Sequence, residues 1–470
     1  MTHPEPTLTA SLTLIRSGPA GPEVFLGKRR RDRSFLPGFH AFFAGKVEGV
    51  DFQGTDRFDA SRRAALRECF EESQAAFGDD ALDRLQFYGW WATAGWMHPF
   101  LTAFFGLHLT AKEAKRFDSL QDTLDPEEFE SGRWIAADDA LNHWELSPPG
   151  PPFLMTRPLV TILRRLAGDA GTSSDLLFGA DEEAAPFSEH LEPCGGVALV
   201  PLKTPTLPPA THTNALILGQ EELLIVDPGA WDAPSLRPLV DILRDRVASG
   251  HEVQGLFLTH HHRDHVGGIA ELSRGFNAPL FAHPETLARL DDLPQDSRAI
   301  TDGESISLDL PCPVEALHTP GHAPGHLALH LDSCGIIAAG DLVASGSTIM
   351  IDPDEGSMAR YLQSLRRLKA LDPAVLIPAH GGLITDPLDH LQAVIDHRLH
   401  REALVFDALK NAGSATADDL IPAVYSDVPR AVWPLARQSL ISHLLHLVEQ
   451  DRATYDGAVY RWVPSPNTLR

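Results

Sequence analysis

The sequence lacks any run of about 18 apolar residues, the length that a membrane-spanning helix needs. It contains only four cysteines, and no two of them form a Cys-x-x-Cys pair. Such scattered cysteines are typical of reduced thiols in a cytoplasmic protein. The first residues also lack the basic patch and apolar stretch of a secretory leader. We therefore predict a cytoplasmic protein that does not span a membrane.

Positive charge is also scarce in this chain. Its 470 residues include 39 Lys and Arg against 64 Asp and Glu, which gives a formal net charge of −25. A chain of this length predicts more than one domain. Residues 1–190, 191–402 and 403–470 have net charges of −10, −14 and −1. No part of the chain is basic, so binding to nucleic acid or to a membrane surface has no evident electrostatic driving force.

The densest chemical signal lies in residues 256–268. An apolar run from 256 to 258 predicts a buried strand of a mostly parallel sheet, which ends at Thr259. Five of the next six residues can bind a metal, namely His260, His261, His262, Asp264 and His265. Imidazole and carboxylate are the usual ligands of zinc and its neighbours. Gly267 and Gly268 then allow a tight turn into a helix. The stretch predicts a metal-binding loop at the end of a strand.

The spacing of His260, His262, Asp264 and His265 resembles the His-x-His-x-Asp-His signature of the metallo-β-lactamase superfamily. Four other segments resemble the remaining motifs of that family, in the same order: residues 224–229 with Asp227, 318–322 with His322, 338–341 with Asp341, and 377–382 with His380. The five segments lie between residues 224 and 382. His261 and Arg263 occupy spacer positions, and we expect them to point away from the metals.

The resemblance implies a binuclear metal site with seven ligands. One metal would be bound by His260, His262 and His322, the other by Asp264, His265 and His380, with Asp341 as the bridge. The nitrogen-rich ligand set favours Zn²⁺, and Mn²⁺ or Fe²⁺ stay open. A hydroxide held by the metals would be the nucleophile. The candidate catalytic residues are Asp264, Asp341, Asp227, which would orient the metal loop, and His326.

Three further residues of this region have two interpretations each. His326 would either support a ligand or donate a proton, or it would pack against the sheet. His212 and Asn214 would either bind the substrate or form a polar strand edge.

Strand-like segments alternate with helical ones throughout residues 191–402, which predicts an α/β fold. The resemblance implies an αββα sandwich that has the metals at one edge of its two sheets.

Residues 1–170 predict a separate α/β domain. Residues 8–15 and 23–27 are expected to form a hairpin, and residues 61–73 a helix with Glu68, Glu71 and Glu72 on one face. Clustered carboxylates suit Mg²⁺. Residues 67–72 resemble the core of the Nudix box, in which these three glutamates bind Mg²⁺. Gln74 stands where that box has glycine, and Ala44 stands at the first of the paired glycines that precede it. Pyrophosphatase activity on coenzyme A or nucleotides, a ligand-sensing module, and a charged surface helix all stay open.

Arg30 belongs to the basic stretch 28–33, which would either hold a phosphate of the substrate or form a solvated loop. Residues 171–190 are small, polar and acidic, and they predict a linker.

Residues 403–470 predict three helices and a hairpin, an arrangement typical of a winged helix. With six basic and seven acidic residues, this part favours a packing or substrate-lid role over nucleic-acid binding. It resembles the superfamily branch that includes endoribonucleases and polyketide thioesterases.

These observations predict a metal-dependent hydrolase that acts on a small-molecule ester or thioester, of the acyl-coenzyme A or acyl-carrier-protein type. The alternative is an endoribonuclease acting on single-stranded RNA. A locally basic groove beside the metals would favour RNA, and a narrow apolar pocket would favour the thioester. The N-terminal domain would add either a pyrophosphatase or a binding module.

Overall fold

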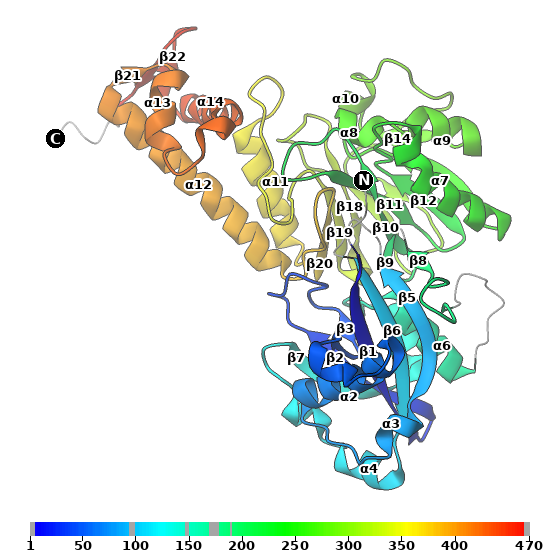
Figure 1. Ribbon diagram of the computed structural model, residues 1–470. Helices are drawn as coiled ribbons and strands as arrows, with labels where there is room; N and C mark the ends of the chain where they lie inside the picture. Colours follow the sequence, from blue (N-terminus) through cyan, green and yellow to red (C-terminus); the bar gives the residue numbers. More distant parts are fainter. Residues whose placement is uncertain (1–4, 94–98, 146–149, 169–177, 189, 465–470) are drawn as a thin grey trace. The chain divides into compact units, whose positions relative to one another are not determined.

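The computed structural model describes residues 5–93, 99–145, 150–168, 178–188 and 190–464 (Figure 1). The chain divides into two compact units. The first consists of Met1–Pro201 with Leu216–Gln220, and the second of Leu202–Ala215 with Glu221–Arg470. The domain boundaries that we predicted after residues 170, 190 and 402 stay predictions.

A mixed eight-stranded sheet forms the frame of the first unit, with β1 at its centre. Strand β1 pairs antiparallel with β2 and β4 and parallel with β6, and the predicted hairpin of β1 and β2 is confirmed. The order along the sheet is β3-β2-β1-β6-β5-β8, with β7 paired to β2. The strands are β1 (Thr7–Gly18), β2 (Gly21–Arg29), β3 (His40–Ala41), β4 (Phe43–Lys46), β5 (Gln86–Thr93), β6 (Phe100–His108), β7 (Phe129–Ala136) and β8 (Phe187–Ser188).

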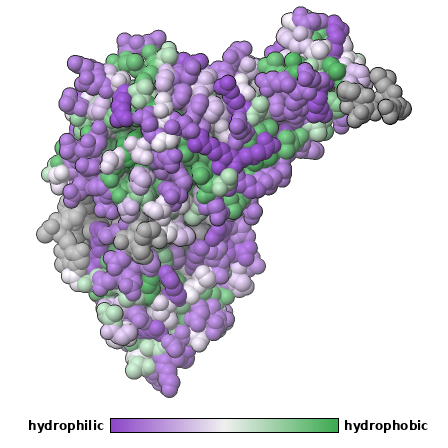
Figure 2. Space-filling model, turned by 180° about the vertical axis from the view of Figure 1, so that it is seen from behind, coloured by the Kyte–Doolittle hydropathy of each residue, from purple (hydrophilic) through white to green (hydrophobic). Residues whose placement is uncertain are grey.

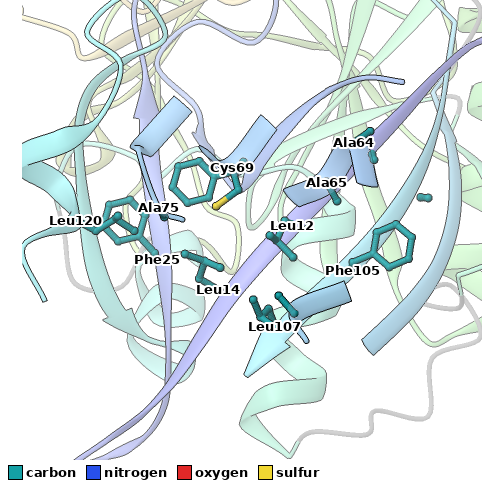
Figure 3. Packing of buried hydrophobic residues seen from close by; sticks show 14 of the residues in the cluster. Leu12, Leu14, Phe25, Ala64, Ala65, Cys69, Ala75, Phe105, Leu107 and Leu120 are labelled. Atoms are coloured by element: carbon teal, nitrogen blue, oxygen red, sulfur yellow. The ribbon is translucent and has the colours of Figure 1, made fainter. Parts of the chain in front are cut away.

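Helix α2 (Arg57–Ser73) packs against β1 and β4 of this sheet. Its small buried residues Ala64, Ala65 and Cys69 face Leu12 and Phe105 in one apolar core (Figure 3). Small side chains on the helix let it approach the sheet closely, and the opposite face keeps its glutamates at the surface or in the adjoining cavity. The other helices are α1 (Gly49–Phe52), α3 (Ala81–Arg84), α4 (Ala111–Arg116), α5 (Ala137–Trp144) and α6 (Arg157–Ala167).

Part of the predicted linker is joined to the sheet of the first unit. Phe178 is buried against Trp91 and Phe104, and β8 adds a parallel strand beside β5. An aromatic ring and a paired strand anchor these residues more firmly than a free linker. Residues 171–177 and 189 of the predicted linker lie outside the described residues.

Two sheets carry the metal-binding segments of the second unit. The larger has the order β15-β14-β13-β12-β11-β10-β9, and β12 to β15 run parallel; the smaller has the order β16-β17-β18-β19-β20. The strands are β9 (Leu191–Cys194), β10 (Val197–Lys203), β11 (His212–Leu218), β12 (Glu222–Val226), β13 (Glu252–Phe257), β14 (Leu280–Ala282), β15 (Arg298–Ala299), β16 (Ser305–Ile306), β17 (Val314–His318), β18 (Leu327–Leu331), β19 (Ile336–Gly340) and β20 (Val375–Pro378). Of these strands, β9, β10 up to Pro201 and the end of β11 are counted with the first unit.

Helices cover these sheets from outside, which explains the nearly continuous apolar strands. All residues of β18 and β19 are buried, so these two strands of the smaller sheet have no face in water. Helices α11 (Met358–Ala370) and α12 (Pro387–Ala412) pack against this sheet, and α7 (Ala233–Ala248) and α9 (Ile269–Phe276) pack against β13. The predicted α/β fold of this region is confirmed. The short helices α8 (Arg263–Val266) and α10 (Pro284–Leu287) complete this part.

The C-terminal part is built on the last turns of α12. We expected a helix from residue 403, but α12 begins at Pro387 and runs without a break across the predicted boundary at 402 (Figure 1). No glycine or proline interrupts its residues 388–412, so nothing in the chain ends the helix earlier. Helices α13 (Ala417–Val424) and α14 (Trp433–Glu449) and the strands β21 (Ser414–Ala415), β22 (Ala453–Tyr455) and β23 (Tyr460–Trp462) complete the predicted winged helix.

The four cysteines are buried, and two of them are neighbours that the sequence did not indicate. The Sγ atoms of Cys312 and Cys334 lie 2.7 Å apart. No helix among the described residues is both long and apolar enough to cross a membrane. On the face shown in Figure 2, hydrophobic residues lie in patches among hydrophilic ones.

Glycines allow the loop after β12 to touch the metal loop. A Cβ atom on Gly229 would lie 1.8 Å from the carbonyl oxygen of Asp264, and one on Gly267 would lie 2.1 Å from that of Ala230. The amide of Gly268 donates to the carbonyl of Pro228 at 2.7 Å. The two loops therefore meet backbone to backbone, and a side chain on either glycine would push them apart.

We expect Gly229→Ala to lower the stability of the second unit by about 2 kcal/mol or more, because the added methyl group has no space beside a main-chain oxygen. Thermal unfolding of the purified protein measures this change. Gly275→Ala is the matched control, since nothing lies within 4 Å of the added Cβ atom on α9. Equal transition temperatures for the two variants would contradict the contact.

Candidate metal centre

The predicted metal ligands come from loops at the ends of four strands. His260 and His262 follow β13, and Asp264 and His265 lie on the short helix α8 directly after them. The remaining three follow β17, β19 and β20, as His322, Asp341 and His380. The structure thus brings all seven predicted ligands together from segments far apart in the chain. Their individual roles stay predictions.

Three histidine nitrogens converge on one point. The Nδ1 atom of His262 lies 2.9 Å from the Nε2 atoms of both His260 and His322, and those two Nε2 atoms are 3.2 Å apart. Neutral imidazole carries a proton on only one of its two nitrogens. If the nitrogen that faces away from this point carries the proton, the nitrogen that faces the point has a free lone pair.

Each outer nitrogen of this trio faces an oxygen that accepts its proton. The Nδ1 atom of His322 lies 2.8 Å from the carbonyl oxygen of Met350, and the Nε2 atom of His262 lies 2.6 Å from a carboxylate oxygen of Glu355. The Nδ1 atom of His260 lies 3.0 Å from the hydroxyl of Thr259, whose own proton goes elsewhere. The inner nitrogens therefore present three lone pairs to one another, an arrangement that needs a cation between them.

A second group lies beside the first. The Nε2 atom of His380 is 3.4 Å from a carboxylate oxygen of Asp264 and 3.3 Å from the Oδ1 atom of Asp341. The Nε2 atom of His265 is 3.6 Å from the same Oδ1 atom. Both that nitrogen and that oxygen are buried without a hydrogen-bond partner. A buried acceptor atom without a hydrogen-bond partner destabilises the folded protein, and a bound cation would remove this cost in free energy.

Asp341 stands between the two groups. Its Oδ1 atom faces His265 and His380, whereas its Oδ2 atom lies 3.4 Å from the Nε2 atom of His322. The side chain is only 8% exposed, so its charge needs partners in the interior. One carboxylate with an oxygen directed to each group suits a pair of metals, and the His and Asp donors fit a di-metal site. The donor set does not fix which metal is bound.

Asp227 holds the metal loop from behind. Its Oδ1 atom accepts the amide proton of Thr259 at 2.8 Å. Its Oδ2 atom accepts from the hydroxyl of Thr259 at 2.7 Å and from the Nδ1 atom of His265 at 2.9 Å. The residue is buried and has a φ of 47°, a left-handed conformation that β-branched residues avoid and aspartate tolerates. The orienting role predicted for Asp227 agrees with these bonds.

His326 is fully buried and uses both ring nitrogens. Its Nε2 atom accepts the amide proton of Asp341 at 3.0 Å, and its Nδ1 atom lies 2.8 Å from the hydroxyl of Thr319. Burial lowers the pKa of His326 to about 3, so the ring is neutral. In this structure His326 therefore supports the main chain of Asp341, and both of its ring nitrogens are used within the protein. Proton transfer by His326 stays a prediction.

His212 and Asn214 support the loop that carries His380. The main-chain oxygen of His212 accepts from the Nδ1 atom of His380 at 3.0 Å. The buried amide of Asn214 donates to the carbonyl oxygens of Pro378 and Gly381 at 2.9 and 2.8 Å. Both donors of Asn214 are thus used within the protein. Substrate binding by these two residues stays a prediction.

Glu355 is the residue of this site that sequence reasoning missed. Its carboxylate lies 2.6 Å from the Nε2 atom of His262 and 3.1 Å from the Nε2 atom of His261. Hydrogen bonds from these two histidines hold the pKa of Glu355 well below its usual range. His261 is thereby directed to Glu355 and away from the group formed by Asp264, His265 and His380. Glu355 lies 93 positions from His262 in an acidic turn that matches no motif, so only the fold reveals it.

A cavity of about 600 Å³ opens beside the metal-binding residues. At one part of its wall lie His262, Asp264, His322, Asp341 and His380. The rest is formed by loops 205–210 and 344–350, by α12, and by the winged helix through residues such as Tyr425, Val432 and Leu435. The winged helix thus contributes directly to the space in which a substrate would meet the metals.

A second cavity of about 600 Å³ lies in the first unit and is lined by Glu68, Glu71 and Glu72 of α2. Arg67 bonds to Glu68 and Glu71, each at 2.9 Å, and the carboxylate of Glu72 accepts the amide proton of Ala44 at 3.1 Å. Burial raises the pKa of Glu72 well above its usual range. The groups of metal-competent side chains found among the described residues do not include these three glutamates.

Arg30, the predicted phosphate contact of the first unit, lies at the surface. Its guanidinium forms a pair with Asp32 at 2.5 Å and donates to the carbonyl oxygen of Pro126 at 3.1 Å. Its neighbour Arg29 lines the cavity of the first unit instead. A role of Arg30 in substrate binding stays a prediction.

Two family models match the second unit. Residues 208–380 match the Metallo-beta-lactamase superfamily, and residues 416–462 match the Beta-lactamase associated winged helix domain. Neither match extends to residues 1–207, and the first unit is assigned to no family. Among solved structures, a Beta-lactamase domain protein from Burkholderia ambifaria shares the fold, with a TM-score of 0.51 and 20% identity over 57% of this chain and 91% of that one.

Curated proteins are similar to about half of the chain. The Beta-lactamase-like protein 2 homolog of Drosophila melanogaster is 27% identical over 51% of this chain and 83% of its own length. An Atrochrysone carboxyl ACP thioesterase of Aspergillus fumigatus is 30% identical over 47% of this chain and 70% of its own length. Together with the His and Asp groups described above, these matches show that the chain belongs to the metallo-beta-lactamase superfamily and is a metal-dependent hydrolase.

Proposed function

We propose that the second unit hydrolyses an ester or thioester, with an acyl thioester of coenzyme A or of a carrier protein as the preferred substrate. The observation that carries this proposal is the cavity beside the metal-binding residues. Leu207, Val428, Val432 and Leu435 give it apolar walls. Burial of an acyl chain against such walls is favourable by about 25 cal/mol per Å². Similarity to an ACP thioesterase of Aspergillus fumigatus supports the same substrate class.

The residues of the centre have distinct tasks in this reaction. Metal ions bound there would lower the pKa of a water molecule and polarise the scissile carbonyl group. The bonds of Asp227, Glu355 and Met350 fix which nitrogen of each histidine faces inward. His326 fixes the main chain at Asp341, so that the two carboxylate oxygens of Asp341 stay directed to the two groups of histidines. The protein thus arranges its ligands before any substrate arrives.

A second candidate function is hydrolysis of single-stranded RNA. Arg398 and Arg401 line the cavity, so it is not wholly apolar. A channel for single-stranded nucleic acid usually tracks several phosphates with a positively charged groove and stacks bases on aromatic rings. Two arginines, and Tyr425 as the one Phe, Tyr or Trp among the described lining residues, form a small set for that purpose. We therefore rank RNA below the thioester.

The first unit carries a third candidate, a Nudix-type pyrophosphatase or a binding module for coenzyme A or nucleotides. The cavity lined by Glu68, Glu71 and Glu72 supports this reading, as does the bond from Ala44 to Glu72. The carboxylates would hold Mg²⁺ next to a diphosphate. A cleft of this kind also suits a regulatory ligand that is bound and not cleaved.

We expect Asp341→Ala to lower the bound metal and to reduce hydrolysis by roughly 10³-fold or more, because both metal groups lose the carboxylate between them. Mass spectrometry of the products from a panel of acyl-coenzyme A thioesters, with elemental analysis of the protein, measures both effects. His261→Ala is the control and should retain its metal, since its ring faces Glu355. Two metals and an unchanged rate in Asp341→Ala would refute the assignment.

We expect Glu355→Ala to weaken metal binding by about 10- to 100-fold, because His262 would lose the acceptor that fixes its proton. Competition with a chromophoric chelator measures the affinity. Glu271→Gln, an exposed carboxylate on α9, removes the same charge outside the centre and serves as the control. Identical metal affinities in wild type and Glu355→Ala would show that the contact has no such role.

We expect Glu71→Gln to abolish the release of phosphopantetheine species from coenzyme A, if the first unit is a pyrophosphatase, because it removes a carboxylate at the cavity. The same mass spectra, recorded with Mg²⁺ present, detect these species. Asp341→Ala should leave them unchanged, since it lies in the other unit. Titration of coenzyme A into wild type then separates a binding module from an inert fold.

A further inference from the structure

Arg398 is a buried cation in the wall of the cavity that also holds the metal-binding residues. It lies on α12, is 3% exposed and lines the cavity. Its Nη2 atom donates to the carbonyl oxygen of Ile349, and its guanidinium lies over the ring of Tyr361 at 5.4 Å. Its Nε atom is buried without a hydrogen-bond partner. Among the described residues, no carboxylate lies within ion-pair distance of it.

The nearby charged groups are engaged elsewhere. Arg401, one turn along α12, pairs with Asp427 at 3.1 Å through both of its Nη atoms. Glu402, which shares a face of α12 with Arg398, lies 2.5 Å from the Nδ1 atom of His446. The positive charge of Arg401 is therefore balanced locally, whereas that of Arg398 is not. His397 beside it has a pKa below its ordinary value, first because of burial and then because of the two arginines.

Burying a guanidinium without an ion-pair partner costs free energy, and an anion bound beside it would offset that cost. The cavity offers no carboxylate for this purpose, because Asp264 and Asp341 face the histidines of the centre. An anion would have to arrive with the ligand. Planar guanidinium groups bind carboxylate and phosphate oxygens with two parallel hydrogen bonds, and Arg398 lines the cavity without an ion-pair partner among the described residues.

We infer that Arg398 recognises an anionic group, a carboxylate or a phosphate, on the small-molecule substrate hydrolysed at the metal centre. The inference rests on the hydrolase function proposed above and narrows its substrate. The anion has two sources in a thioester. It is either a carboxylate on the acyl chain or the phosphate of the phosphopantetheine arm.

Four thioesters separate these sources. Succinyl and butyryl groups differ by a terminal carboxylate, and each is attached either to pantetheine or to pantetheine 4′-phosphate. Hydrolysis of all four by the metal-loaded, full-length protein gives kcat and KM separately. The variants are Arg398→Met, which keeps the length of the side chain, and Arg398→Lys, which keeps the charge. Arg366→Met removes an exposed cation from α11 of the same unit and serves as the control.

We expect wild type to prefer either the two succinyl substrates, which share the carboxylate, or the two phosphorylated substrates, which share the phosphate. In Arg398→Met, kcat/KM for the preferred anionic substrate should fall about 10- to 100-fold, as for loss of a charged hydrogen bond. The neutral butyryl-pantetheine should change little, and Arg398→Lys should recover part of the loss. An equal loss on all four substrates would show that Arg398 only anchors α12 to Ile349, and it would overturn the inference.

Binding of thioether analogues of the same four compounds, measured by calorimetry, needs no turnover. Tight binding of an anionic analogue that is lost in Arg398→Met would support the inference even if no thioester is hydrolysed. In that case the proposed thioesterase function would be refuted, and anion recognition by Arg398 would stand. Hydrolysis without any preference for an anion would leave that function intact and overturn the inference. Cleavage of a single-stranded oligonucleotide with the same dependence on Arg398 would overturn the assignment to a small molecule.

Discussion

The metal centre depends on one buried carboxylate, that of Asp227. It accepts protons from the amide and the hydroxyl of Thr259 and from the Nδ1 atom of His265. Because the hydroxyl of Thr259 donates to Asp227, it can only accept from His260. A single carboxylate thus sets the proton positions on two histidines and leaves their Nε2 lone pairs directed inward. The left-handed φ of 47° is the conformational cost of placing this carboxylate behind the loop.

The loops that carry the ligands are held by the chain around them, and this explains several residues that bind no metal. Asn214 secures the turn of His380, His326 secures the main chain of Asp341, and Gly229 lets the first loop lie directly on the metal loop. Ligands on loops that are fixed at both ends lose little entropy when a metal binds. The strands end where these loops begin, so the fold supplies a rigid edge and the loops supply the chemistry.

Much of this could be predicted from the sequence, and the reason is local spacing. His260, His262, Asp264 and His265 lie within six residues, so their meeting needs only a loop and one turn of helix. The contacts that the sequence did not reveal join distant segments. Glu355 meets His262 across 93 positions, and Cys312 meets Cys334 across 22. The uninterrupted helix α12 was also missed in part, because composition changes near residue 402 while helical hydrogen bonding does not.

The placement of Arg398 follows from that same helix. One end of α12 packs on the smaller sheet and the other end carries the winged helix, so its middle passes the cavity. A chain with a net charge of −25 repels anions at long range, but exposed charges are screened beyond about 8 Å at physiological ionic strength. Close to the centre, the field is set by buried groups that water screens weakly. An uncompensated guanidinium beside metal-binding histidines therefore makes the cavity favourable to an anion, whatever the charge of the outer surface.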